Sequence, residues 1–184
     1  MKISNYVNKI ITIMSCLVLI VLLLFLPILR LQDMSNNLII EPKTMFGFNI
    51  IVGYRIKNPS IYSTEGNYIP ILHSTVVSLI PIFCLLGIIV LFNIKNDSFG
   101  KEIINVILSI VACVIFGLFP VILLQYTYET YQPYLEFVKL AGWYVDLIFL
   151  CIFATYQIVY LIVSGTKRFK EVNKFTEIPK PDEG

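Results

Sequence analysis

The polar side chains best able to do chemistry in this sequence lie inside or just beyond long apolar runs. His73 and Asp146 lie about one turn inside two of these runs, Gln125 ends a third, and Glu129 follows it. An ionisable group within a membrane-spanning helix is a candidate functional site, because its burial in lipid is costly. The pattern predicts one outward-facing polar pocket for a small cation, a proton or a polar ligand. The alternative places all four groups at the membrane interface, where water reaches them.

Gln157 is the deepest polar side chain of the apolar runs and completes the set of candidate pocket residues. It lies roughly two turns from the inner end of the last run, between Tyr156 and Tyr160. Such an amide either lines a conduction path or forms a hydrogen bond between helices, and the second role is the commoner one in membrane proteins. The sequence leaves both roles open.

The cysteines show no motif that predicts redox or metal chemistry. Each of the four lies in an apolar run, and no two are closer than 29 residues: Cys16, Cys84, Cys113 and Cys151. Without a C-x-x-C pair, we expect small packing side chains rather than a redox or zinc motif. One histidine and one aspartate do not make a metal site, and no phosphate loop or hydrolase motif is present. We therefore predict no catalytic residues, no metal and no cofactor.

The composition and the apolar runs indicate a membrane protein. Hydrophobic residues make up 57% of the chain and charged residues 14%, whereas a soluble domain has about 25% charged residues. Four runs can each cross a hydrocarbon core of about 30 Å. We predict an all-α four-helix transmembrane bundle over residues 1–165, with helices at about 10–29, 71–94, 103–125 and 143–164. Pro81 predicts a kink in the second helix.

The distribution of Lys and Arg predicts the orientation of the bundle. With both termini in the cytoplasm, nine of the 14 basic residues lie inside: Lys2, Lys9, Lys95, Lys101, Lys167, Arg168, Lys170, Lys174 and Lys180. Gly165 is a candidate C-cap of the last helix. We expect residues 166–184 to form a basic, partly disordered tail that meets anionic lipid. The net charge of +2 and the absence of a basic, aromatic-rich face argue against a nucleic-acid partner.

Both predicted outer loops carry more apolar and aromatic residues than a solvated loop needs. The loop at 30–69 holds apolar clusters at 38–40 and 46–54, which predict a short hairpin or an interfacial helix. It is too short to bury its own core, so we expect it to pack on the helix ends, a partner or the lipid surface. The tyrosines in and after the loop at 126–142 predict an aromatic belt; a sugar- or peptide-binding surface is the alternative.

Three small residues in the third run predict a close helix contact. Ser109, Cys113 and Gly117 are spaced by four, so they share one helix face. The spacing leaves open whether the partner is another helix of this chain or a second chain.

The layout resembles that of the claudin and tetraspan families, which also have four membrane helices and a long first outer loop. Claudins carry a Trp-Gly-Leu-Trp run and two cysteines in that loop, and this chain has neither. Residues 47–53, Gly-Phe-Asn-Ile-Ile-Val-Gly, are also similar to a loop pattern of small four-helix bacterial membrane proteins. The resemblance concerns the layout and implies no activity.

Three functional hypotheses follow from these patterns. The first is a non-enzymatic accessory or scaffold subunit of the cell membrane, acting through helix and outer-loop contacts with another membrane protein or a second copy. The second is a homo-oligomeric channel or small transporter built around the polar pocket. The third is a membrane thiol oxidoreductase, against which the cysteine spacing argues.

Overall fold

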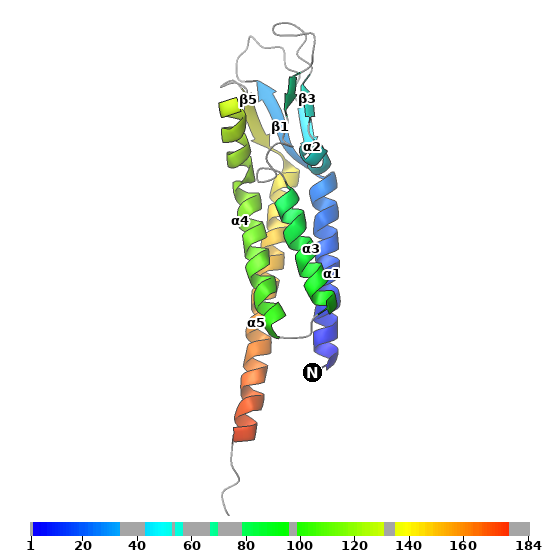
Figure 1. Ribbon diagram of the computed structural model, residues 1–184, viewed down its shortest axis with the longest axis vertical. Helices are drawn as coiled ribbons and strands as arrows, with labels where there is room; N and C mark the ends of the chain where they lie inside the picture. Colours follow the sequence, from blue (N-terminus) through cyan, green and yellow to red (C-terminus); the bar gives the residue numbers. More distant parts are fainter. Residues whose placement is uncertain are drawn as a thin grey trace, which may run out of the picture.

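The computed structural model describes residues 2–33, 43–52, 54–56, 67–69, 79–95, 99–130 and 135–176. Side chains are described for residues 6–30, 44–51, 79–95, 100–122 and 138–169. In this part of the chain, long helices lie side by side in a narrow bundle, and the strands gather at one end of it (Figure 1). The bundle helices are α1 (Lys2–Phe25), α3 (Ile80–Lys95), α4 (Phe99–Thr130) and α5 (Ala141–Thr176).

Three of these helices are long and apolar enough to cross a membrane. The spans are Tyr6–Phe25 of α1, Gly100–Ile122 of α4 and Ala141–Phe169 of α5, while α3 is a shorter apolar helix. Their lipid-facing sides expose large apolar side chains such as Val21, Leu118 and Ile152. A soluble protein rarely exposes so continuous an apolar surface. The predicted class, a mostly helical membrane protein, is therefore confirmed.

A small sheet caps the end of the bundle opposite the N-terminus. β1 (Pro27–Asp33) lies between its antiparallel neighbours β2 (Lys43–Phe46) and β5 (Leu135–Lys139), so the strand order is β2-β1-β5. The short helix α2 (Gly47–Val52) follows β2, and β3 (Tyr54–Ile56) pairs with β4 (Asn67–Ile69). Of the two apolar clusters at 38–40 and 46–54, the first lies outside the described residues, and most of the second forms α2. The strands go beyond the predicted all-α class.

Several predicted helix ends were wrong. The first helix ends at Phe25 rather than at residue 29, because Pro27 cannot donate to the helical ladder and instead begins β1. The last helix continues past Gly165 to Thr176, into the predicted tail. Pro81 lies in the first turn of α3, where a missing N–H costs nothing, so the structure gives no reason for a kink there. Residues 71–78 of that predicted helix lie outside the described residues.

The apolar core extends from the middle of the bundle into the sheet. Leu19, Leu86, Phe116 and Leu150 bring the helices together, and Ile28, Leu29 and Met45 continue the core under the sheet. On the other face of the sheet, Arg30 pairs with Thr44 of β2, and both side chains are exposed. The sheet therefore has one face packed on the bundle and one face turned away from it.

Candidate functional site: polar groups buried in the bundle

Asp146 is the most unusual side chain of the bundle interior. It lies in the second turn of α5 and is 0% exposed. Neither carboxylate oxygen has a hydrogen-bond partner among the described residues. A buried carboxylate without a partner is costly unless a proton or a cation neutralises it. The expectation that water reaches this group at the interface is therefore not met, and Asp146 remains the best candidate for a functional side chain.

Trp143 lies one turn before Asp146 on the same buried face of α5. Its ring stacks on Phe116 of α4 at a centroid distance of 6.2 Å and meets Tyr144 edge-on at 4.9 Å. Lys139 of β5 places its Nζ 4.4 Å from the centre of the Trp143 ring. The indole N–H has no acceptor among the described residues. Trp143 therefore belongs to the core, whereas the neighbouring Tyr144 is exposed, as an aromatic belt requires.

The opposite half of the bundle interior holds a second group of buried polar side chains, which are hydrogen-bonded between helices. Gln157 of α5 donates from Nε2 to the Thr12 hydroxyl of α1 over 3.1 Å. One residue earlier, the Tyr156 hydroxyl donates to Asn8 Oδ1 over 2.6 Å. Both pairs join α1 to α5. The sequence left two roles open for Gln157, an interhelical hydrogen bond and a place in a conduction path. The structure shows the hydrogen bond.

The same polar group continues between α3, α4 and the end of α5. Asn93 of α3 donates from Nδ2 to Asn105 Oδ1 of α4 over 3.2 Å, and both residues are buried. Glu102 of α4 is 4% exposed and accepts a hydrogen bond from the Ser164 hydroxyl. Its other oxygen lies 3.5 Å from Arg168 Nη2. We name these residues, together with the two pairs above, the inner polar cluster.

The structure places two of the predicted pocket residues apart and does not describe the side chains of the other two. Asp146 and Gln157 lie on the same helix but eleven residues apart, which is about 16 Å along its axis. His73 lies outside the described residues. Gln125 and Glu129 belong to α4, but their side chains lie outside the described part. The pocket of His73, Gln125 and Asp146 therefore stays a prediction, and Gln157 belongs to the inner polar cluster instead.

The predicted small-residue face of α4 packs against α5 of the same chain. Gly117 lies opposite Leu147, whose Cδ1 would be 3.9 Å from a Cβ added to the glycine. One turn further, Cys113 Sγ lies 3.3 Å from Cys151 Sγ. Along this contact, two residues four apart on α4 meet two residues four apart on α5. The face thus contacts a helix of this chain, and the two thiols that meet there escaped a search restricted to spacing along the sequence.

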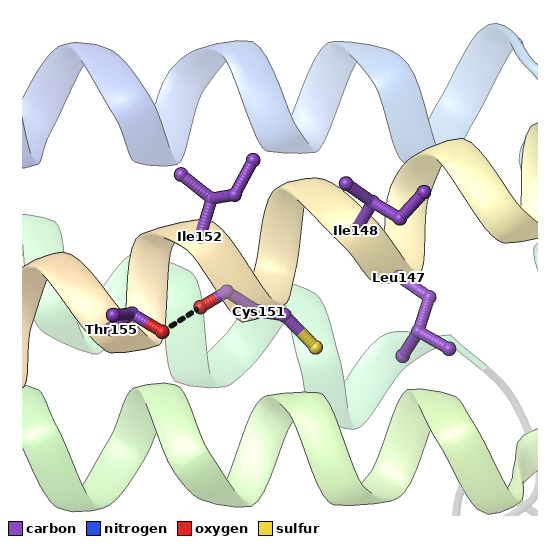
Figure 2. Close-up of a pocket in the computed structure, with 5 residues that line it drawn as sticks. All are labelled: Leu147, Ile148, Cys151, Ile152 and Thr155. Carbon is purple, nitrogen blue, oxygen red and sulfur yellow. Dashed lines mark hydrogen bonds between the residues drawn. The ribbon is translucent and has the colours of Figure 1, made fainter.

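A groove on the lipid-facing side of α5 lies next to this thiol contact. It has a volume of about 400 Å³ and is lined by Leu147, Ile148, Cys151, Ile152 and Thr155. Figure 2 shows these side chains on successive turns of α5, with the Thr155 hydroxyl bonded to the Cys151 carbonyl oxygen. The lining is almost entirely apolar.

No group of three or more metal-ligating side chains occurs in the described part of the chain. Comparison with protein-family models, with curated proteins and with solved structures finds no match to this chain. Its function must therefore be argued from its own geometry.

Proposed function

We propose that this chain is a non-enzymatic accessory or scaffold subunit of the cell membrane, which crosses the bilayer four times. Its sheet-capped end would contact another membrane protein on the outer side. The observation that carries this proposal is the close attachment of the sheet to the helix ends, which makes the cap a fixed surface.

The attachment is made by backbone contacts that leave no room for side chains. A Cβ added to Gly47, at the start of α2, would lie 1.6 Å from the Leu23 carbonyl oxygen of α1. A Cβ added to Gly142 of α5 would lie 2.3 Å from the Pro27 carbonyl oxygen. The Leu140 N–H also donates to the Ile28 carbonyl oxygen over 2.9 Å. A surface held in this way is prepared to bind without losing much conformational freedom.

The four-span topology is supported by the length and position of α3. Its 16 residues span about 24 Å. The apolar run of the sequence that contains α3 begins at residue 71, and by its length this run can cross a bilayer. The start of α1 and the end of α5 lie at the end of the bundle away from the sheet (Figure 1). With the basic residues counted above, this arrangement supports two cytoplasmic termini and an outer sheet.

A photo-crosslinking amino acid placed in native membranes tests the proposal. Positions Arg30 and Thr44 lie on the exposed face of the sheet, and Val159 and Ile162 on the lipid-facing side of α5 serve as matched controls. We expect one protein of defined mass to be crosslinked from both sheet positions and from neither control. The mass of the native protein, extracted in mild detergent, is measured as well. If it equals that of a monomer and neither sheet position gives a crosslink, the role as a subunit is refuted.

A homo-oligomeric channel or small transporter is the second candidate function, and buried Asp146 is the observation that favours it. A carboxylate with no partner among the described residues can bind and release a proton or a small cation. Four helices seldom enclose a pore alone, so this function requires several copies. Ion or proton flux into liposomes that falls in Asp146→Asn, but not in the exposed control Tyr144→Phe, would support it. If flux is equal in the original chain, Asp146→Asn and Tyr144→Phe, or if none of them exceeds empty liposomes, Asp146 does not carry the ion or proton.

A further inference from the structure

The contact between α4 and α5 contains a pair of thiols that sequence spacing did not indicate. Cys113 Sγ and Cys151 Sγ are 3.3 Å apart, within hydrogen-bond distance for sulfur, and either thiol can be the donor. A disulfide requires an S–S distance of about 2.05 Å, so a shift of little more than an ångström would join them. The small residues Ser109 and Gly117 flank Cys113 on α4 and keep this contact close.

The two sulfurs differ in their access to the surroundings. Cys113 is half-buried between the helices, whereas Cys151 is exposed and lines the apolar groove of α5 (Figure 2). Cys151 lies within the Ala141–Phe169 span, ten residues from its start. This is about 15 Å along the helix, or half the thickness of a hydrocarbon core of about 30 Å. At this depth the groove opens to lipid rather than to water. An oxidant that reaches Cys151 must therefore be soluble in the membrane.

We propose that Cys113 and Cys151 form an oxidisable dithiol that a lipid-soluble quinone converts to a disulfide. The two S–H bonds break and one S–S bond forms, so the pair loses two electrons and two protons. The quinone gains both and leaves as the hydroquinone. The disulfide would link α4 covalently to α5, and reduction by a thiol would restore the open pair. This inference does not rest on the accessory-subunit role proposed above.

The remaining two cysteines provide controls within the same chain. Cys16 is fully buried on α1, and Cys84 is exposed on α3. Neither has a sulfur contact with another cysteine among the described residues. Cys84 thus matches Cys151 in exposure but has no second thiol beside it. Oxidation that depends on exposure alone would affect Cys84 and Cys151 alike, whereas oxidation of a pair affects Cys113 and Cys151 together.

The experiment uses the full chain in phosphatidylcholine liposomes, exposed to decylubiquinone, to oxidised glutathione or to copper phenanthroline. Free thiols are then labelled with a maleimide in denaturant, and each cysteine is identified by peptide mass. We expect decylubiquinone to lower the labelling of Cys113 and Cys151 about tenfold relative to oxidised glutathione, which stays in water. Labelling of Cys16 and Cys84 should not change, and one hydroquinone should appear per disulfide.

Two variants separate the pair from its surroundings. Cys151→Ser should leave Cys113 fully labelled and should yield no hydroquinone, whereas the double variant Cys16→Ser/Cys84→Ser should behave like the original chain. A disulfide formed with copper phenanthroline but not with decylubiquinone would overturn the quinone as oxidant. Continued labelling of both cysteines in all three reagents would overturn the pair itself.

Discussion

The two ends of the helical bundle are held together in different ways. At the end that carries the N-terminus, side chains of different helices meet through hydrogen bonds, as in the Gln157–Thr12 and Asn93–Asn105 pairs. At the sheet-capped end, backbone contacts of Gly47 and Gly142 hold the cap. Among the described residues, the one buried carboxylate without a partner, that of Asp146, lies at this sheet-capped end.

This difference separates a structural role for polar groups from a functional one. In lipid, a polar side chain that finds a partner on another helix contributes modestly to stability, whereas one that finds none costs stability. The inner polar cluster fits the first case. Asp146 fits the second, and proteins tend to retain such costly groups where activity needs them. We therefore expect substitutions at the two ends to affect stability with different size and different sign.

The largest effect is expected where the cap meets α1. Gly47→Ala would place a Cβ 1.6 Å from the Leu23 carbonyl oxygen, a backbone atom that cannot move without displacing α1 or α2. We expect the free energy of unfolding to fall by about 3 kcal/mol. Equilibrium unfolding by SDS in mixed micelles measures this change.

Gly87→Ala is the matched control, because nothing lies within 4 Å of the added Cβ. Alanine also favours a helix over glycine by about 1 kcal/mol, so this variant should be unchanged or more stable. If both alanine variants unfolded like the original chain, the cap would not be fixed to α1. The proposal of a rigid outer surface would then lose its main support.

The second prediction concerns the sign of the effect at Asp146. Asp146→Asn keeps the size of the side chain and removes an ionisable group that is buried without a partner among the described residues. We expect the free energy of unfolding to rise by about 2 kcal/mol, in the same SDS titration. A fall instead would mean that the carboxylate takes part in a stabilising contact, and Asp146 would then join the structural groups.

The third prediction tests the inner polar cluster. Gln157→Leu removes the donor to Thr12, and we expect the free energy of unfolding to fall by about 1 kcal/mol. A double-mutant cycle with Thr12→Val isolates the pair. Thr155→Val serves as a control, because the Thr155 hydroxyl bonds to the Cys151 carbonyl of its own helix and to no other helix among the described residues. Additive effects of Gln157→Leu and Thr12→Val would show that this hydrogen bond stabilises nothing.

The sequence predicts the membrane class and the approximate position of the helices because these depend on length and composition. It fails at Pro27, where a local steric rule ends the helix inside an apolar run. It also underestimates the last helix, since α5 continues through Gly165 and the basic residues after it. Hydropathy measures solubility in lipid and does not record where a helix continues beyond the membrane.

The candidate site is less predictable, because it depends on which side chains meet across helices. The spacing of Ser109, Cys113 and Gly117 predicts a packing face, but it does not show that Cys151 lies opposite Cys113. Asn93 and Asn105 carry no motif in the sequence, yet both are buried and bonded to each other across α3 and α4. Asp146 was recognised from its residue type and its place inside an apolar run. Its lack of a partner among the described residues appears only in three dimensions.

The smallest expected effect tests whether the contact of the cap with the core includes a charge. Lys139 of β5 lies over the ring of Trp143, which is one turn before Asp146 on α5. Lys139→Gln removes the cation from the ring and leaves a polar side chain one atom shorter. An exposed cation–π contact contributes about 0.5 kcal/mol, and the free energy of unfolding should fall by that amount. Lys139→Arg should preserve it, because a guanidinium also binds an aromatic face. If Lys139→Gln destabilised Asp146→Asn as much as the original chain, the lysine would act through Trp143 alone. A smaller effect in the Asp146→Asn background would show that Lys139 also stabilises the Asp146 carboxylate, and that this carboxylate at the sheet-capped end is partly neutralised without a hydrogen bond.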